Sequence, residues 1–293
     1  FIGFAIKVPV FPFHTWLPLA HVEAPTAISV LLAGILLKLG IYGILRINYG
    51  LMPDGVYWFS GALAVLGLIN VIWGGLCALA QTDLKKLVAY SSVNHMGYSL
   101  IGMAAIVAAG EANGMNLKAA QAGLGGAVFQ MFNHGTISAM LFILVGVIYD
   151  RAHHRDIEGF GGLAAQMPIY TGITAVAFFA GLGLPGFSGF ISEAMCFIGA
   201  FPVYKGIVIA STIGILLNAA YFLWAFQRIF FGELNEKYTD LPEINRLELF
   251  TVVPLLVITI FFGIYPAPYL DIIASTMDVI IDHVVTLATF ASM

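Results

Sequence analysis

Residues 26–46, TAISVLLAGILLKLGIYGILR, form an apolar stretch with a single lysine, Lys38, near its centre. A helix of this length rises 1.5 Å per residue and can cross about 30 Å of hydrocarbon. A charged side chain near the middle of such a helix costs at least ~2.5 kcal/mol on insertion scales, so it usually faces a bundle interior and marks an ion or proton path. The stretch therefore predicts a membrane-spanning helix that carries a functional group.

The composition of the whole chain supports a membrane protein. Of its 293 residues, 60% are hydrophobic and 10% are charged, whereas a soluble domain has about a quarter charged residues. The formal net charge is only -4, and the sequence has no block of basic residues. Nucleic acid and a polybasic lipid-binding patch are therefore excluded as expected partners. The chain starts with Phe and shows no signal peptide, so we expect it to begin inside a larger protein.

Hydropathy predicts an all-α polytopic membrane protein with about eight spans. The expected spans cover 1–16, 26–46, 56–80, 84–108, 119–149, 168–200, 206–231 and 247–265. After them, the tail over 269–290 alternates aspartates and apolar residues at helical spacing, which predicts an amphipathic helix lying in the membrane interface.

The basic residues of the connections divide unequally between the two expected sides. One side collects Lys85, Lys86, Arg151, Arg155, Arg228, Lys237 and Arg246, and the other collects Arg46, Lys118 and Lys205. The positive-inside rule predicts that the first set is cytoplasmic, or on the matrix side in a mitochondrion. The amphipathic tail is expected on the opposite face.

Two expected spans carry helix breakers beside a charged residue. Pro9 and Pro12 follow Lys7, and a run of glycines with Pro185 precedes Glu193. Broken helices in corresponding positions of inverted repeats point to the transport site in many transporters. We therefore predict an inverted five-helix repeat, with 1–49 as the end of one repeat, 56–232 as a complete second repeat and 247–265 as an additional helix. The first helices of the earlier repeat are expected to lie outside this chain.

Ionisable residues inside the apolar stretches are the candidate proton-relay groups. They are Lys7, Lys38, His95, His134 and Glu193. Helix capping is the alternative role for Glu193, and a satisfied core position is the alternative for each histidine. His14, His21, His153 and His154 are expected at the interface, and Cys77 and Cys196 in the core. Because the relay groups stand on separate stretches, we do not expect them to form side-by-side structural pairs.

Proton transfer suits this set of groups better than transport of a larger substrate. Burial shifts lysine and glutamate toward the range in which they exchange protons, and histidine titrates there unperturbed. No sequence motif for a nucleotide, haem or iron–sulfur cluster is present, and no metal-ligand spacing is found. The energy for proton movement is therefore expected to come from another subunit.

Five motifs in the chain carry a family resemblance. They are KVPVFPFHTWLPLAHVEAPTA (7–27), LLAGILLKLGIYG (31–43), DLKKLVAYSSVNHMGYSLIG (83–102), FNHGTISAMLFILVGVIYDR (132–151) and GLPGFSGFISE (183–193). Together they resemble the antiporter-like membrane subunits of respiratory complex I and of multi-subunit cation/proton antiporters. The HVEAP run and Glu193 on the second broken helix resemble the chain-M-type branch of that family.

The resemblance implies a role for each relay group. Lys7 would be the central lysine of a first half-channel, Lys38 and His95 bridging groups, His134 a group on a long central helix, and Glu193 the terminal group of a second half-channel. The family pairs the lysine at the Lys7 position with a glutamate on an earlier helix, which this sequence does not contain. Leu19 stands where the family often has a polar residue.

The resemblance also implies the assembly in which the chain works. It predicts a proton-translocating subunit of NADH:quinone oxidoreductase in a bacterial plasma membrane or the mitochondrial inner membrane, next to other antiporter-like subunits. No cofactor is expected in this chain, and NADH, FMN, iron–sulfur clusters and quinone are expected in other subunits. A subunit of a sodium/proton antiporter and a purely structural membrane subunit are the alternatives.

Overall fold

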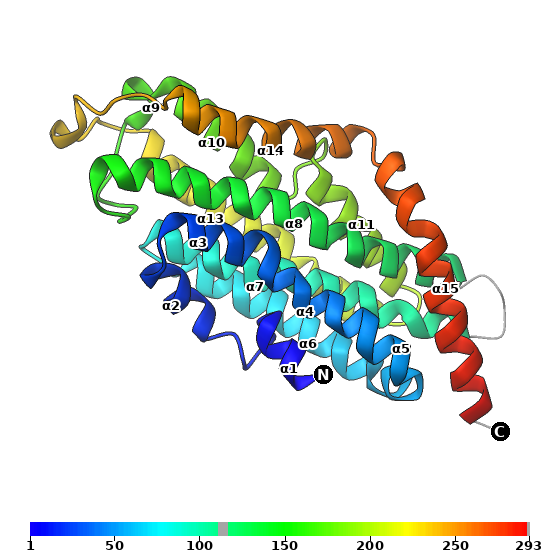
Figure 1. Ribbon diagram of the computed structural model, residues 1–293. Helices are drawn as coiled ribbons and strands as arrows, with labels where there is room; N and C mark the ends of the chain where they lie inside the picture. Colours follow the sequence, from blue (N-terminus) through cyan, green and yellow to red (C-terminus); the bar gives the residue numbers. More distant parts are fainter. Residues whose placement is uncertain (111–116, 292–293) are drawn as a thin grey trace.

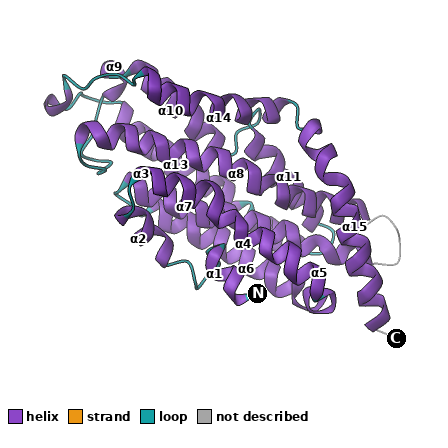
Figure 2. Cartoon of the chain, viewed as in Figure 1, coloured by secondary structure: helices purple, strands orange, loops and turns teal. Residues whose placement is uncertain are grey.

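The computed structural model describes residues 1–110 and 117–291, which form helices joined by short loops (Figures 1 and 2). Six helical segments in this part of the chain are long and apolar enough to cross a membrane. In chain order they are Thr26–Leu51, α6 (Pro53–Leu79), Leu84–Gly110, α8 (Leu117–Ala152), Lys205–Phe230 and α14 (Arg246–Ile264). The first of these is divided into α3 (Thr26–Leu31), η1 (Leu32–Leu36), α4 (Leu37–Gly43), η2 (Ile44–Asn48) and α5 (Tyr49–Leu51). Leu84–Gly110 consists of α7 (Leu84–Ala104) and η3 (Ala105–Gly110), and Lys205–Phe230 of α12 (Lys205–Ser211) and α13 (Ile213–Phe230). The all-helical prediction is confirmed, and the count of about eight spans stays a prediction.

Two further apolar segments are broken near their middle. The first consists of α1 (Ile2–Lys7) and α2 (Trp16–Glu23), and the second of α10 (Pro168–Gly181) and α11 (Ser188–Ala200). Both breaks lie where the prolines and glycines predict them. The expected end of the first span at residue 16 is wrong, because Trp16 begins a second half-helix there.

A buried asparagine secures the first break. Asn70 of α6 is fully buried; its Oδ1 accepts from the Phe11 backbone N–H at 2.7 Å, and its Nδ2 donates to the Pro9 carbonyl at 3.1 Å. The Trp16 indole N–H donates to the Ile6 carbonyl at the end of α1, at 2.9 Å. Backbone groups freed by a break inside a membrane must be satisfied by protein or water, and these side chains do so here.

Helices α7 and α8 form the centre of the bundle and carry the two candidate relay histidines. Nearly every residue of α7 is buried, and α8 is the longest helix of the described residues. Glycines let α6 and α7 approach closely, because a Cβ built on Gly97 would lie 2.7 Å from the Gly67 carbonyl oxygen. Small residues allow such backbone contacts between membrane helices. His95 on α7 and His134 on α8 are therefore held in the interior.

The connections with most basic residues meet at one end of the bundle. Asp83 caps α7 by accepting from the Lys85 backbone N–H at 2.7 Å, and its other oxygen pairs with Arg155 at 3.2 Å. Arg151 forms a two-pronged contact with both Glu248 oxygens, at 2.9 and 2.8 Å. Such bidentate pairs are geometrically specific. These contacts join the loops before α7, after α8 and before α14, as the charge distribution predicts; the side of the membrane stays a prediction.

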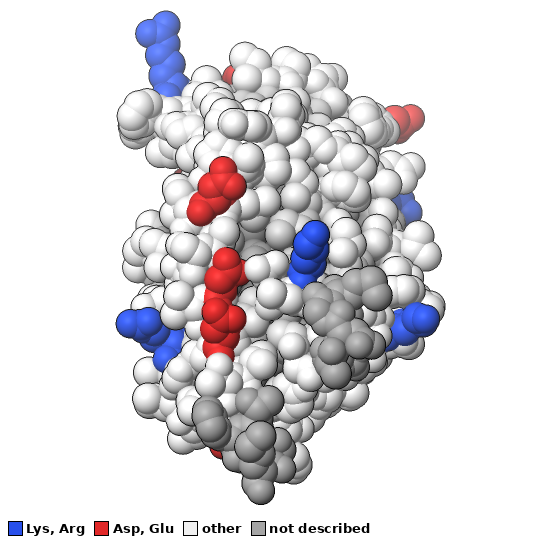
Figure 3. All heavy atoms as spheres, turned by 90° about the vertical axis from the view of Figure 1, so that its right-hand side faces the viewer, with Lys and Arg blue, Asp and Glu red and all other residues white. Residues whose placement is uncertain are grey.

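Helix α15 (Ala267–Ala291) crosses the other end of the bundle (Figure 1). It buries Met277, Ile281 and Val284, and leaves Asp271 and Asp282 exposed. Acidic side chains form a row on this face in Figure 3. The predicted amphipathic helix is thus present over nearly the predicted range, and its place in a membrane interface remains a prediction.

Candidate functional site: a buried row of ionisable side chains

Lys38 lies on α4 between two wide π-helical turns, η1 and η2. Single π turns in helices occur frequently at functional sites. The Lys38 side chain is 8% exposed; its ammonium donates to the Ala33 carbonyl of η1, contacts His134 Nδ1 at 2.7 Å and lies 3.5 Å from Ser138 Oγ. All three donors of the ammonium therefore have a partner.

Lys38 and His134 form a tightly coupled pair. At 2.7 Å the two nitrogens cannot both carry a positive charge without strong repulsion. One of the two groups supplies the shared hydrogen and the other accepts it, so the pair takes up and releases protons as a unit. This contact joins α4 to α8.

His95 and Glu193 form the second pair. His95 Nδ1 lies 2.9 Å from Glu193 Oε1, and both side chains are almost fully buried. This contact joins α7 to α11, the second half of a broken helix. The expectation that the ionisable groups would not stand side by side is wrong, because packing of separate helices brings their tips together.

A polar network holds the Glu193 carboxylate on its other side. Gln130 Nε2 donates to Glu193 Oε1 at 3.3 Å, Ser192 Oγ donates to Gln130 Oε1 at 2.5 Å, and Asn133 Nδ2 donates to Ser192 Oγ at 3.0 Å. These contacts fix the Gln130 amide with its NH₂ toward the carboxylate. The sequence identifies Gln130 and Asn133 as polar neighbours of His134. Ser192 was missed, although it immediately precedes Glu193.

The two pairs meet at a narrow junction. The rings of His95 and His134 are 5.5 Å apart between centroids, and both border a void of about 10 Å³, together with Ser91 and Ser138. Both Nε2 atoms are buried without a hydrogen-bond partner among the described residues. A void of this size is close to the lower limit for one water molecule. Each imidazole thus uses Nδ1 within its pair and keeps Nε2 free.

Lys7, the fifth predicted group, is not part of this row. It ends α1 and is half-buried, and its ammonium has no hydrogen bond or ion pair within the described residues. The neighbouring Val8 packs closely on Gly40, since a Cβ built on Gly40 would lie 2.7 Å from the Val8 side chain. Lys7 therefore stands beside the Lys38 helix without a polar partner in this part of the structure.

His14 and His21, the two histidines of the first broken segment, are buried. The expectation that they lie at the interface is therefore wrong. His21 is fully buried and stacks on Phe142, with ring centroids 4.3 Å apart. His14 accepts from the Trp73 indole N–H at 3.1 Å. His14 lies in the loop of the break, where it contacts Trp73 of α6, and His21 lies on α2, where it packs on Phe142 of α8. His153 and His154 lie in the loop after α8, as expected.

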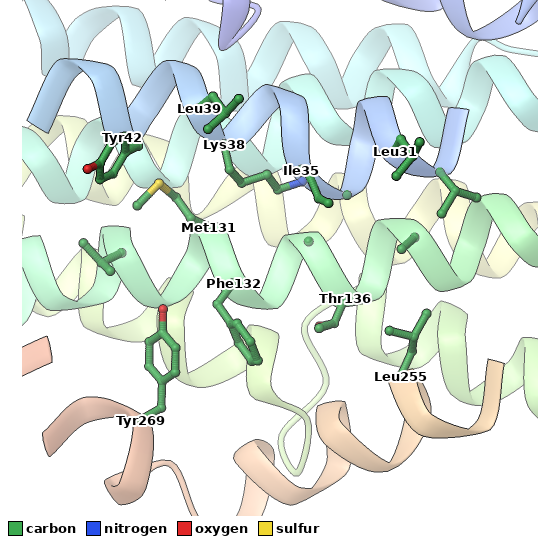
Figure 4. Close-up of a pocket in the computed structure, with 15 residues that line it drawn as sticks. Leu31, Ile35, Lys38, Leu39, Tyr42, Met131, Phe132, Thr136, Leu255 and Tyr269 are labelled. Atoms are coloured by element: carbon green, nitrogen blue, oxygen red, sulfur yellow. The ribbon is translucent and has the colours of Figure 1, made fainter. Parts of the chain in front are cut away.

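An apolar cavity of about 550 Å³ opens beside Lys38. It lies between α3–α4 and α8, with Leu255 of α14 and Tyr269 of α15 on its far side (Figure 4). Lys38 is its only charged lining residue among those the structure describes. Within the same residues, no cluster of three or more His, Cys, Asp or Glu side chains is placed to hold a metal.

This combination defines a class of protein. Two broken helices and a row of buried Lys, His and Glu side chains in a bundle of apolar helices are typical of membrane transporters that move protons or small cations. The profile of the family described as "NADH:quinone oxidoreductase/Mrp antiporter, TM" matches residues 1–218. The chain belongs to this family.

Individual relatives agree with the family assignment. The chain is 43% identical to "NADH-quinone oxidoreductase subunit M" of Rhodobacter capsulatus over 278 residues, covering 94% of this chain and 52% of the relative. It is 40% identical to "NADH-ubiquinone oxidoreductase chain 4" of Chondrus crispus, covering 92% and 53%. A chain of respiratory complex I from Thermus thermophilus superposes with a TM-score of 0.85 at 27% identity, covering 98% and 57%. The chain thus spans about half the length of the curated relatives it matches.

Proposed function

We propose that this chain is part of a proton-translocating membrane subunit of NADH:quinone oxidoreductase, of the subunit M type. The observation that supports this most directly is the row Lys38–His134–His95–Glu193, in which contacts of 2.7 and 2.9 Å flank one narrow junction. Groups that bind and release protons near neutral pH, placed at hydrogen-bonding distance across a membrane protein, are the physical requirement for a relay.

The use of the ring nitrogens suggests the order of proton transfers. Lys38 would donate its N–H to His134 Nδ1, and His134 would release a proton from Nε2. One water in the junction could pass it to His95 Nε2, and His95 would then donate from Nδ1 to Glu193 Oε1. Each imidazole takes a proton on one nitrogen and releases it from the other, so each returns to its starting charge.

Energy for this transfer must come from outside the described residues. Moving one proton against ~200 mV requires about 4.6 kcal/mol, at ~2.3 kcal/mol per 100 mV. We propose that redox chemistry in other subunits, with NADH, FMN, iron–sulfur clusters and quinone, supplies it. Neighbouring antiporter-like subunits in a bacterial plasma membrane or the mitochondrial inner membrane are the proposed partners.

The test compares Lys38→Ala with Lys205→Ala, which changes an exposed lysine at the start of α12. In purified assemblies returned to liposomes, we expect inhibitor-sensitive NADH:quinone activity. Proton uptake per electron should be lost in Lys38→Ala and kept in Lys205→Ala. Absence of NADH:quinone activity from the intact assembly would favour a sodium/proton antiporter and contradict the proposal.

The close His95–Glu193 contact gives a second candidate some support, because an ion pair can also hold helices together. A purely structural role predicts that Glu193→Ala reduces assembly but leaves proton uptake per electron unchanged in the complexes that assemble. A relay role predicts assembled complexes that transfer electrons with less proton uptake. Measuring both quantities on the same preparation separates the two candidates.

A further inference from the structure

A second apolar cavity, of about 430 Å³, lies beside the break in the α10/α11 segment. Apolar side chains of Leu184, Phe190, Ile198 and Ile215 line it, and all four are substantially exposed. Glu193 is the only charged residue among its described lining residues. A buried carboxylate thus borders a cavity whose walls are otherwise suited to a hydrocarbon chain.

The two oxygens of this carboxylate have different surroundings. Oε1 accepts from Gln130 at 3.3 Å and contacts His95 at 2.9 Å. Oε2 has no hydrogen-bond donor within reach among the residues the structure describes, and it is not an enclosed atom. A charged oxygen in apolar surroundings is costly unless it is paired. Oε2 therefore has unused capacity to accept a hydrogen bond.

A glycine keeps the space next to Oε2 open. Gly183 has φ +79°, and a Cβ built on it would lie 3.0 Å from Oε2. Gly183 also lines the cavity. A side chain at this position would therefore crowd Oε2, and glycine leaves the space beside this oxygen free.

The cavity beside Lys38 lacks this property. It is larger, at about 550 Å³, and equally apolar, but the Lys38 ammonium already has a partner for each donor. In Figure 4 the Lys38 side chain runs along the wall of the cavity, on the α4 side. Of these two cavities, the one beside Glu193 combines apolar walls with a carboxylate oxygen that has no hydrogen-bond donor among the described residues.

We propose that the Glu193 cavity is a binding site for lipophilic ammonium ions, with the ammonium at Glu193 Oε2 and the hydrocarbon chain against Phe190, Ile198 and Ile215. The charge complementarity favours a cationic head over a neutral one, and the apolar walls favour an alkyl tail over a hydrated metal ion. An ammonium bound there would compete with protonation of Glu193 and so inhibit proton transfer. That consequence rests on the proposed function, whereas binding itself does not.

The test uses n-decylammonium that carries a photoreactive diazirine in its alkyl chain, and the matched n-decanol derivative. The full protein in its native assembly is irradiated with each probe, and labelled residues are mapped by mass spectrometry. We expect the ammonium probe to label α11 near Phe190 and Ile198 in a saturable manner. Excess n-decylamine should compete, and n-decanol should not.

Two variants with matched controls test the site. Glu193→Gln should lower saturable labelling about tenfold or more, since removing one partner of a buried charge contact weakens binding strongly; Asp271→Asn, an exposed acid on α15, should not. Ala219→Phe fills the cavity without changing Glu193 and should also abolish labelling, whereas Ala220→Phe on the exposed side of α13 should not.

Equal labelling by the decanol probe, or labelling insensitive to Glu193→Gln and Ala219→Phe, would overturn the proposal and indicate a site for neutral acyl chains. The outcome is independent of transport. Saturable labelling without NADH-driven proton uptake would support the binding site and contradict the proposed function. NADH-driven proton uptake without saturable labelling would support the proposed function and contradict the binding site.

Discussion

The two broken segments have similar construction but different surroundings for their charged residue. In the first, Lys7 precedes the break, is half-buried and lacks a polar partner among the described residues. In the second, Glu193 follows the break, is 6% exposed and contacts His95 and Gln130. The break places a charge inside the bundle in both cases. Partners come only from the helices packed around it, and α7 and α8 supply them for Glu193.

The loops of the two breaks are also stabilised differently. Asn70 of α6 binds two backbone groups of residues 8–15. Residues 182–187 instead turn through Gly183 and Gly186, with φ of +79° and +101°. The first break therefore depends on a side chain far away in the sequence, and the second on the backbone freedom of glycine.

The largest expected effect concerns the charged residues themselves. Glu193→Gln should lower proton uptake per electron by roughly 10²-fold in the assembled protein, because glutamine can accept from His95 but cannot take up a proton. Uptake is measured by dye quenching in liposomes, with Asp271→Asn as the control. Normal uptake in Glu193→Gln would show that the row does not end at this carboxylate.

Lys7→Gln tests whether the charged residue of the first broken segment also takes part in proton uptake. A loss of proton uptake as large as that of Glu193→Gln would show that Lys7 takes part in the relay although its ammonium has no polar partner among the described residues. Wild-type uptake in Lys7→Gln would show that the first broken segment is not part of the relay.

Removing the side chain that holds the first break should reduce stability. Asn70→Leu leaves the Phe11 N–H and the Pro9 carbonyl without their side-chain partner, and we expect a loss of about 2–4 kcal/mol in the free energy of unfolding. Unfolding in mixed micelles measures this change. The control is Ser99→Ala, which removes a buried hydroxyl that has no partner among the described residues. Equal stability of the two variants would mean that water replaces Asn70.

Glycine substitutions test the second break. Gly183→Ala should cost about 1–2 kcal/mol from its left-handed backbone, with an additional cost from the methyl group 3.0 Å from Glu193 Oε2. Gly186→Ala has the same kind of backbone but open space around its Cβ. Unfolding experiments on both variants should therefore rank Gly183→Ala as the less stable. The reverse order would contradict the position of Oε2.

The smallest expected effect lies at the basic end, outside the helices. His154 Nε2 contacts the Tyr238 hydroxyl. Burial lowers the pKa of His154 from 6.5, nearby Asp156 raises it, and Lys237 lowers it. Below pH 6.5 the unfolded chain then binds more protons than the folded one. The free energy of unfolding should therefore fall as the pH decreases through this range, by less than ~1 kcal/mol because the imidazole is only partly buried and solvent screens its interactions.

Thermal unfolding at pH 7.5 and 5.5 measures this dependence. His154→Gln should reduce the difference between the two pH values, and His153→Gln, which changes an exposed neighbour, should retain it. An unchanged difference in His154→Gln would assign the pH dependence to other groups.

Several features could be predicted from the sequence because they depend on local chemistry. Apolar stretches longer than a bilayer, prolines and glycines inside them, and aspartates at helical spacing in the tail predicted the helices, both breaks and the amphipathic α15. Asn70 is a single polar residue in an apolar run, and a buried polar group needs a hydrogen-bond partner. The sequence could therefore have indicated its buried contact, but this signal was overlooked. The continuation of the first segment to Glu23 was missed: the sequence predicted the break after Lys7 but ended the span at residue 16, where α2 begins.

The sequence by itself determined that this is a helical membrane protein with five ionisable residues in apolar surroundings, because the hydrophobic periodicity and the cost of burying charge are both local properties. Only the tertiary structure decided which of these residues meet. Lys38 contacts His134, His95 contacts Glu193, and Lys7 stands apart. The physical reason is that such contacts depend on the rotation and depth of helices far apart in the sequence, which packing at glycines such as Gly67 and Gly97 fixes.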